Sequence, residues 1–496
     1  MVGLFQINKM GPNDFVDRVY SWFRSPKDSL NQRILHSGFW ASFLNVSDRS
    51  FQIIRLIILA RLLSPSDFGL LGLALLTMQI LNQFTNLGID AALIQRQDEI
   101  KSYLDTVWLL KISRGFVVFV VLIISSPIVS EFFGEPQLKW VLPALAAGVI
   151  IRSFANPAIV YFQRELEFQK QFVYQMSGTV VDFIIAIVFA IRFHSVWALV
   201  FGILGGRLTR LAISYLISDY RPALRFDRKA ASDLLQFGKW MWATGLVVLI
   251  ATSGDDAFVG WYLPAAALGL YQLAFRLSNT PATEVTHVIS SVMFPAYSKI
   301  QDNQDRLRSS FRRTIRVVVS LTTPMALGIL VIASPFTQVF LGSQWMAMVP
   351  TMQVVAIAGL VRSILATGGA LFQGVGLPEW DFRMNLIRAS TIILTLWPLT
   401  SRWEIAGTAV SITLGLLSTI PIWVYKSSDI TGLLIKDYVY EILIPVGSSL
   451  LMAYVVSIVV EPTILRLIVS VITGIIIYFP TLYALHRAMG TRLLNV

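Results

Sequence analysis

The sequence predicts an all-α protein that crosses a membrane many times. Of its 496 residues, 55% are hydrophobic and only 14% are charged, whereas soluble domains carry about 25% charged residues. Apolar runs long enough to span a bilayer as helices, about 20 residues each, recur along the whole chain. The two halves of the chain also resemble each other, which is typical of membrane transporters built from repeats.

Fourteen apolar runs are long enough to cross the bilayer. They lie at roughly 37–60, 67–88, 104–128, 138–162, 171–191, 195–217, 238–262, 266–297, 314–333, 348–371, 381–400, 405–425, 438–460 and 464–485.

The distribution of basic residues predicts the orientation of these spans. With a cytoplasmic N-terminus, and with the span-edge residues Lys139, Arg383 and Arg466 counted in the adjoining loops, 23 Lys and Arg lie in cytoplasmic segments and 5 in outward loops. This is the bias that the positive-inside rule requires. We therefore expect a multi-pass membrane protein with both termini in the cytoplasm. The net charge of +11 then reflects topology and contact with anionic membrane lipids, and a nucleic-acid partner is not expected.

The first 36 residues form a polar cytoplasmic segment ahead of the first span. Within it, "DFVDRVYSWFR" places Phe15, Val19 and Phe23 on one helical face. Such a pattern is typical of a short helix lying on the membrane surface. A disordered tail remains an equally good interpretation.

The sequence offers no site for covalent chemistry. It has no cysteine and only four histidines, far apart in sequence, so we expect no cofactor and no metal site. No outward loop exceeds about 15 residues, and neither a Ser-His-Asp set nor an HExxH helix is recognisable. We therefore do not expect an enzyme.

An internal repeat relates the two halves. "ARLLSPSDFGLLGLALL" at 60 aligns with "GWYLPAAALGLYQLAFR" at 260, with Gly69 over Gly269, and "SPIVSEFFG" at 126 aligns with "SPFTQVFLG" at 334. The shift of 200 to 210 residues covers six spans, so both repeats have the same orientation. We expect two six-helix bundles, related by a pseudo-twofold axis along the membrane normal. The expected segments are 37–217, a cytoplasmic linker 218–237, 238–425, and two additional helices in 438–485.

The segment from Asn31 to Arg96, which contains "ARLLSPSDFGLLGLA", resembles the polysaccharide transporter branch of the MOP exporter superfamily. It looks most similar to flippases of the Wzx and colanic-acid types. The resemblance, over roughly 30–490, implies a V-shaped bundle whose central cavity opens alternately to each side. It implies as cargo a polyprenyl-diphosphate-linked oligosaccharide for O-antigen, capsule or exopolysaccharide, and polysaccharide polymerase machinery as a further partner. It also implies that the protein lies in the cell inner membrane.

Charged residues within the spans are the candidate site residues, since a charge at mid-bilayer costs on the order of 3 kcal/mol unless it faces water or a partner. Asp48, Gln52 and Arg55 share one face of the first span at i, i+4 and i+7. The repeat superposes Arg55 on Asp255. Because the resemblance implies that the first and seventh spans line the cavity, these two residues are expected to pair as a gate. The alternative is that Asp255 and Asp256 only satisfy local partners. The candidates for contact with the pyrophosphate, because arginine matches phosphate geometry, are Arg49, Arg55 and Arg276. The candidates for gating or for coupling to H⁺ or Na⁺ are Asp48, Asp255, Asp256 and Glu284.

Two further expectations concern aromatic residues and rival functions. Trp240, Trp242, Trp261 and Tyr271 are expected to stack on sugar rings or to anchor the protein at the membrane interface. The alternatives to a flippase are a cation-coupled drug or metabolite antiporter of the same superfamily and a membrane polysaccharide polymerase or ligase. Small cationic drugs favour carboxylates and aromatic rings, whereas a diphosphate favours the arginines seen here.

Overall fold

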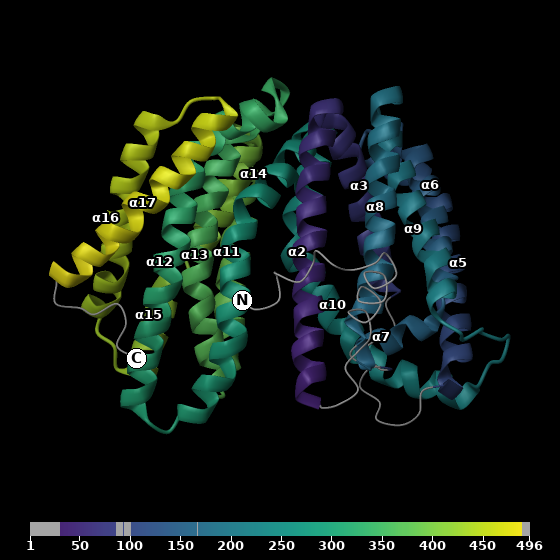
Figure 1. The fold of residues 1–496 in the computed structure, drawn as a ribbon, viewed down its shortest axis with the longest axis horizontal. Coiled ribbons are helices and arrows are strands. Elements are labelled where there is room, and N and C mark those ends of the chain that lie inside the picture. The colour runs from purple at the N-terminus through teal and green to yellow at the C-terminus, as the bar shows by residue number, and fades with distance from the viewer. Residues whose placement is uncertain (1–29, 86–92, 94–100, 166, 489–496) are drawn as a thin grey trace, which may run out of the picture. The chain divides into compact units, whose positions relative to one another are not determined.

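The computed structural model describes residues 30–85, 93, 101–165 and 167–488, and these residues form helices and their connections without any strand. Figure 1 shows the helices, most of them running roughly parallel within each half. The α-helices are α2 Leu30–Leu62, α3 Pro65–Phe84, α5 Lys101–Phe132, α6 Leu138–Ser153, α7 Val160–Arg164, α8 Phe168–Phe193, α9 Trp197–Ile217, α10 Arg228–Tyr262, α11 Ala265–Ile300, α12 Gln304–Phe336, α13 Val349–Gly374, α14 Pro378–Leu417, α15 Ile420–Thr431, α16 Ile435–Val459 and α17 Ile464–Ala488. Three short segments, η2 Pro157–Ile159, η3 Thr337–Leu341 and η4 Ser343–Met348, complete the set.

The predicted apolar runs coincide with helices, because each of the fourteen ranges overlaps at least one of them. Within the described residues, eight helical segments are long and apolar enough to cross a membrane. A ninth qualifies if α6 and the segment 157–164, between which the chain bends by 74°, count as one span. An all-helical, multi-pass architecture is thus confirmed, while the count of fourteen spans stays a prediction. The expected surface helix at 15–23 lies outside the described residues.

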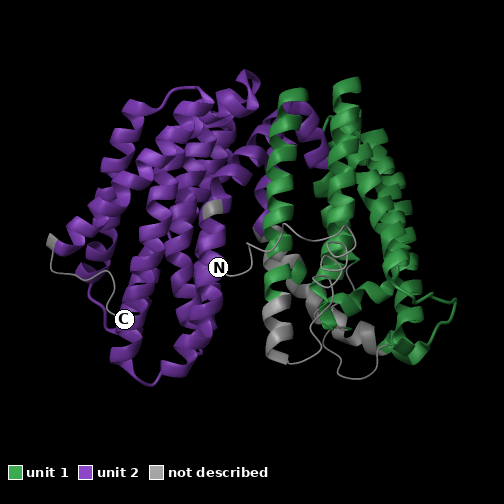
Figure 2. Cartoon of the chain, viewed as in Figure 1, with its two compact units in different colours: residues 1–63, 74–250 green, residues 64–73, 251–496 purple. Residues whose placement is uncertain are grey.

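The chain forms two compact units, coloured separately in Figure 2. Unit 1 contains residues 1–63 and 74–250, and unit 2 contains 64–73 and 251–496. In unit 1, α8 lies along both α2 and α9, while α6 lies along both α5 and α9. The boundaries expected for the two six-helix bundles stay a prediction.

In unit 2, α13 contacts α11, α12 and α14, and α12 also contacts α16, which lies along α17. A buried cluster beside α13 contains Tyr297, Phe311, Phe372 and Trp423. Removal of this apolar surface from water or headgroups favours the packing of α11, α12, α13 and α15.

Two glycines allow α3 and α11 to approach each other closely at their N-terminal ends. A Cβ added to Gly69 would collide with the carbonyl oxygen of Ala265, and one added to Gly269 would collide with that of Pro65. These contacts lie within unit 2, to which residues 64–73 belong. Each glycine therefore touches the residue that lies four positions before the other glycine.

Helix α14 is a helical hairpin. Its backbone leaves helical geometry at Trp403 and Glu404, and Glu404 has φ 49° and ψ −131°. The hydroxyls of Thr400 and Thr408 lie 2.9 Å apart across the two arms, and a Cβ on Gly407 would collide with the carbonyl of Leu399. Small residues of this kind let two helix backbones meet within a membrane. The sequence correctly predicted separate segments at 381–400 and 405–425.

Candidate functional site: charged networks within the helices

The polar stripe predicted on the first span is present on α2 and faces α8. Gln52 Nε2 donates a hydrogen bond of 2.6 Å to Asp48 Oδ2, as the i, i+4 spacing requires. Thr179 Oγ1 on α8 donates to Asp48 Oδ1 at 3.0 Å. Arg55 Nη2 lies 3.0 Å from Asp182 Oδ1, also on α8. The two side chains of this ion pair are 24% and 19% exposed, so the pair is largely desolvated.

Two arginines on α9 extend this network. Arg210 Nη2 donates to Thr179 Oγ1 at 3.1 Å, and Arg207 Nη1 donates to the carbonyl of Leu145 on α6 at 3.2 Å. Glycines make room for these groups, since a Cβ on Gly202 would collide with the carboxylate of Asp182.

The resulting cluster, which we call the unit 1 network, has an excess of positive charge. It consists of Asp48, Gln52 and Arg55 on α2, Thr179 and Asp182 on α8, and Arg207 and Arg210 on α9. Three arginines face two carboxylates. The Nε atoms of Arg55 and Arg210 are buried and have no hydrogen-bond partner among the described residues. A cluster of this kind can receive an anionic group, because guanidinium N–H donors match phosphate oxygens.

The adjacent carboxylates of α10 contact consecutive residues of α11. The hydroxyl of Tyr271 donates to Asp255 Oδ2 at 2.6 Å, and Gln272 is a side-chain hydrogen-bond partner of Asp256. Tyr271 is only 1% exposed. The expectation that Tyr271 stacks on a sugar or anchors the interface is therefore wrong, because its ring is buried and its hydroxyl serves Asp255.

Arg362 on α13 lies near these groups in unit 2. Its Nη1 donates to Asn279 Oδ1 at 3.0 Å, and its guanidinium lies 5.5 Å from the centre of the Phe275 ring. Electrostatic interaction links Arg362 and Arg388 to Asp255. Unit 2 thus holds its own half-buried set of carboxylates and arginines.

The remaining predicted site residues are more exposed. Arg49 on α2 and Arg276 and Glu284 on α11 all have exposed side chains. The structure gives Arg55 and Asp255 partners within their own units, Asp182 and Tyr271. The expected pairing of Arg55 with Asp255, and a joint phosphate site of Arg49, Arg55 and Arg276, connect different units and stay predictions.

The aromatic residue Trp261 behaves as expected of an interface residue. It is 47% exposed and lies in a cluster with Phe258, Tyr262 and Trp397. Such clusters suit the headgroup level of a membrane. The side chains of Trp240 and Trp242 lie outside the described residues.

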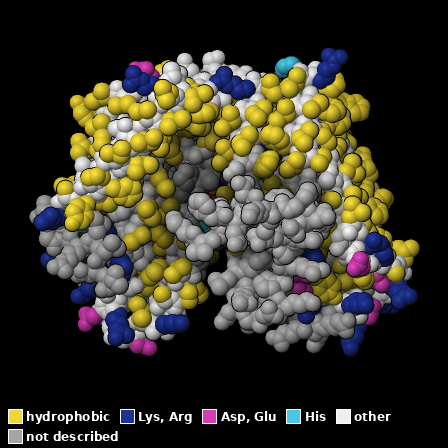
Figure 3. Space-filling view, in the orientation of Figure 1, with side chains coloured by type: hydrophobic (Ala, Val, Ile, Leu, Met, Phe, Trp, Pro, Cys, Tyr) yellow, Lys and Arg dark blue, Asp and Glu magenta, His cyan; other side chains and the backbone are white. Residues whose placement is uncertain are grey.

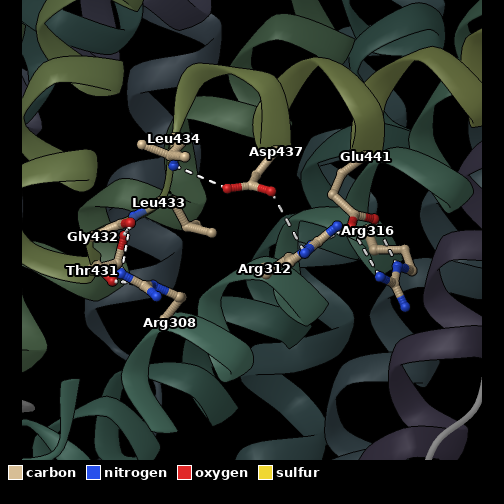
Figure 4. Close-up of polar contacts among 9 residues, drawn as sticks. All are labelled: Arg308, Arg312, Arg316, Thr431, Gly432, Leu433, Leu434, Asp437 and Glu441. Carbon is tan, nitrogen blue, oxygen red and sulfur yellow. Dashed lines mark hydrogen bonds and ion pairs between the residues drawn. The ribbon is translucent and has the colours of Figure 1, made fainter. Parts of the chain in front are cut away.

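A further charged cluster joins α12 to α16, and it was not predicted from the sequence (Figure 4). Glu441 is 1% exposed and receives Arg312 Nε at 2.6 Å and Arg316 Nε at 2.7 Å. Asp437, one turn earlier, lies 3.6 Å from Arg312 Nη1. Arg308 donates instead to backbone carbonyls at the end of α15, at 3.0 and 2.8 Å. The signal was available: arginines at i, i+4 and i+8 and acids at i and i+4 each form one helical face.

Similarity to known proteins agrees with this architecture. The profile of the family described as "Polysaccharide biosynthesis protein" matches residues 58–350. The chain is 25% identical over 433 residues to the lipopolysaccharide biosynthesis protein WzxC of Escherichia coli (strain K12), covering 85% of this chain and 86% of the relative. It is 23% identical over 470 residues to the succinoglycan biosynthesis transport protein ExoT of Rhizobium meliloti (strain 1021), covering 92% and 94%.

Solved structures show the same fold. The lipid II flippase MurJ in its inward closed conformation matches with a TM-score of 0.72 at 14% identity, over 90% of this chain and 99% of that one. An inward-facing multidrug resistance MATE family transporter of the MOP superfamily matches with a TM-score of 0.60 at 15% identity, over 78% and 95%. With more than half of its length matched by the family profile, the chain belongs to the polysaccharide biosynthesis protein family.

Proposed function

We propose that this protein is a membrane flippase that translocates a polyprenyl-diphosphate-linked oligosaccharide across the cell inner membrane for a cell-surface polysaccharide. WzxC and ExoT, named for polysaccharide biosynthesis and transport, align with this chain over most of both lengths. The fold is that of MurJ. A flippase makes and breaks no covalent bond, so the protein needs binding groups and a conformational cycle, and no catalytic residues.

The observation that carries this proposal is the positive excess of the unit 1 network. Arg55, Arg207 and Arg210 outnumber Asp48 and Asp182 within apolar helices. Charges placed there are costly and are retained where they serve a substrate or ion pathway. A diphosphate supplies the negative charge that the network lacks, and the exposed Arg49 and Arg276 are further candidates for contact with it.

The carboxylates are the proposed coupling groups. Asp48, Asp182, Asp255 and Asp256 are each held by side-chain donors within their own unit. Uptake and release of H⁺ or Na⁺ at these positions would change which arginines are neutralised. Binding of H⁺ or Na⁺ shifts the equilibrium between two conformations only if the ion binds one conformation more tightly than the other.

The proposed architecture has fourteen spans, cytoplasmic termini and two bundles related by a pseudo-twofold axis. The reciprocal contacts of Gly69 and Gly269 support the axis, since a twofold operation exchanges equivalent residues. Tags at Asp227 and at both termini should report cytoplasm, and a tag near Pro264 should report the outside. An outward C-terminus would contradict the count of spans.

A cation-coupled drug antiporter is the second candidate, favoured by the MATE-like fold and the half-buried carboxylates Asp255 and Asp256 of unit 2. A polysaccharide polymerase or ligase, the remaining alternative, would act on the same lipid-linked oligosaccharide. We propose such polymerase machinery as a partner of this protein.

Transport by the purified protein in vesicles separates the candidates. A fluorescent polyprenyl-diphosphate oligosaccharide should become protected from an impermeant quencher, and the matching monophosphate should move more slowly. Arg55→Gln should reduce transport, whereas Arg402→Gln, an exposed arginine outside the networks, should not. Export of a cationic dye without movement of the lipid would favour the antiporter.

A further inference from the structure

A cavity of about 780 Å³ lies where the start of α5 meets the connection between α9 and α10. Its lining residues lie at 101–106 on α5 and at 220–227 in the connection. Helix α9 ends at Ile217 and α10 begins at Arg228, so the ends of three helices surround it. Since membrane helices end near the bilayer surface, the cavity lies at headgroup level.

Hydrogen bonds fix the connection against α5 and give the cavity a defined wall. Asp105 Oδ1 accepts the hydroxyl of Tyr220 and, at 2.8 Å, the backbone N–H of Ala223. The backbone N–H of Asp227 donates to Thr106 Oγ1 at 3.0 Å. Burial, reinforced by Asp105, raises the pKa of Tyr220 above its ordinary value. Tyr220 therefore remains a protonated donor, and the wall persists at physiological pH.

The carboxylates at the cavity accept hydrogen bonds from the protein, whereas the side chains of two basic residues there bond no described residue. Asp105 accepts the hydrogen bonds of Tyr220 and Ala223. Asp227 Oδ1 accepts backbone N–H groups in the first turn of α10. Lys101 and Arg225 line the cavity, and their side chains make no hydrogen bond or ion pair with any described residue. Arg221 adds a third positive charge and binds carbonyls of its own turn. The cavity is therefore selective for an anion.

Exposed apolar side chains adjoin these cations. Leu224 is 82% exposed and Phe226, which lines the cavity, is 56% exposed. Figure 3 shows basic, acidic and apolar side chains side by side at the lower right edge of the view, where Figure 1 shows this connection. Apolar residues interleaved with basic ones are typical of segments that enter the lipid headgroup region.

We propose that this cavity binds the headgroup of an anionic phospholipid, with its phosphate on Lys101 and Arg225 and its glycerol and upper acyl chains against Leu224 and Phe226. The volume lies within the range of about 300–1,000 Å³ typical of small-molecule sites. Clusters of basic residues next to a membrane span recognise anionic lipids through charge. A free anion would have no use for the two exposed apolar side chains, so the lipid is the source of the phosphate.

Native mass spectrometry of the full-length protein, delipidated and titrated with phosphatidylglycerol or phosphatidylcholine, tests the proposal. The protein should retain phosphatidylglycerol in preference. Lys101→Gln with Arg225→Gln should weaken its binding by about thirtyfold, roughly fivefold for each charge, and leave phosphatidylcholine unchanged. Lys139→Gln with Arg402→Gln removes two exposed basic residues elsewhere and should have no effect.

Four outcomes decide the matter. Thermal stability of the double variant in detergent should stay unchanged, because neither side chain makes a hydrogen bond or ion pair within the described part of the chain, so loss of lipid will not reflect unfolding. Equal retention of phosphatidylglycerol by the variant and the parent would overturn the site. Displacement of the lipid by millimolar inorganic phosphate would overturn the assignment to a lipid headgroup. Phe226→Ser should weaken binding of phosphatidylglycerol, because the apolar contact with the lipid is lost, and unchanged binding would overturn the assignment to a lipid.

Discussion

Asp182→Asn should destabilise unit 1 through the loss of one charge. The substitution leaves Arg55 without its carboxylate at 3.0 Å and leaves Asp48 as the single carboxylate of the unit 1 network, facing three arginines. Breaking a fully buried ion pair costs about 3–5 kcal/mol, whereas exposed pairs contribute about 0–1 kcal/mol. With side chains that are 24% and 19% exposed, we expect a loss of about 2 kcal/mol in the free energy of unfolding.

A double-mutant cycle isolates the ion pair. Arg55→Gln combined with Asp182→Asn should be less destabilising than the sum of the single substitutions, by roughly 1–2 kcal/mol, because the double variant leaves no unpaired member of this pair. The measurement is denaturant unfolding of the purified protein in detergent micelles, with transport followed in vesicles.

Asp48→Asn combined with Arg55→Gln provides the matched control. Asp48 lies on the same face of α2 but accepts hydrogen bonds from the neutral Gln52 and Thr179, so its coupling to Arg55 should be smaller. Additivity of Arg55 with Asp182 to within about 0.5 kcal/mol, or equal coupling for both carboxylates, would refute the reasoning.

Three further substitutions test other contacts. Glu441→Gln should destabilise the protein by roughly 3–5 kcal/mol and loosen α16, which limited proteolysis in micelles can detect; unchanged protease resistance would contradict a clamp between α12 and α16. Gly269→Ala should reduce both stability and transport, since the added methyl group collides with the carbonyl of Pro65, and a fully active, stable variant would show that the close approach is dispensable. Tyr271→Phe removes the donor to Asp255 without changing the buried ring's shape, so we expect transport to shift in its dependence on pH or Na⁺ more than in its amount, and a transport curve identical to the parent's would exclude this hydrogen bond from coupling.

The sequence predicted helices well because span length and hydrophobicity are local properties of the chain. The face of α2 was also predictable, since Asp48, Gln52 and Arg55 follow helical spacing. The partner that the structure gives Arg55, Asp182, was not predictable. Superposition of the repeats compares equivalent positions, Arg55 with Asp255, and equivalence in a repeat does not imply contact.

The partners that the structure gives within unit 1 depend on which helices pack together. Thr179 and Asp182 lie at i and i+3 on α8 and form a polar face of their own, but nothing local to the sequence indicates that α8 meets α2. Tyr271 was misassigned for a similar reason, since an aromatic ring with a hydroxyl suits both a membrane interface and a buried hydrogen bond. Glu441 was overlooked because Arg312 was counted only as a marker of topology and Arg316 lies within the predicted span 314–333.

The helical hairpin of α14 has a consequence for how the chain enters the membrane during synthesis. Its arms are joined by a turn of two residues, Trp403 and Glu404, and hydroxyl contacts such as that of Thr395 with Ser411, 2.7 Å apart, cross between them. A turn this short cannot connect an arm that is already inserted in the membrane to an arm that is still in water. Residues 378–417 should therefore leave the translocon laterally as one unit, and the orientation of the second arm is then determined by the first.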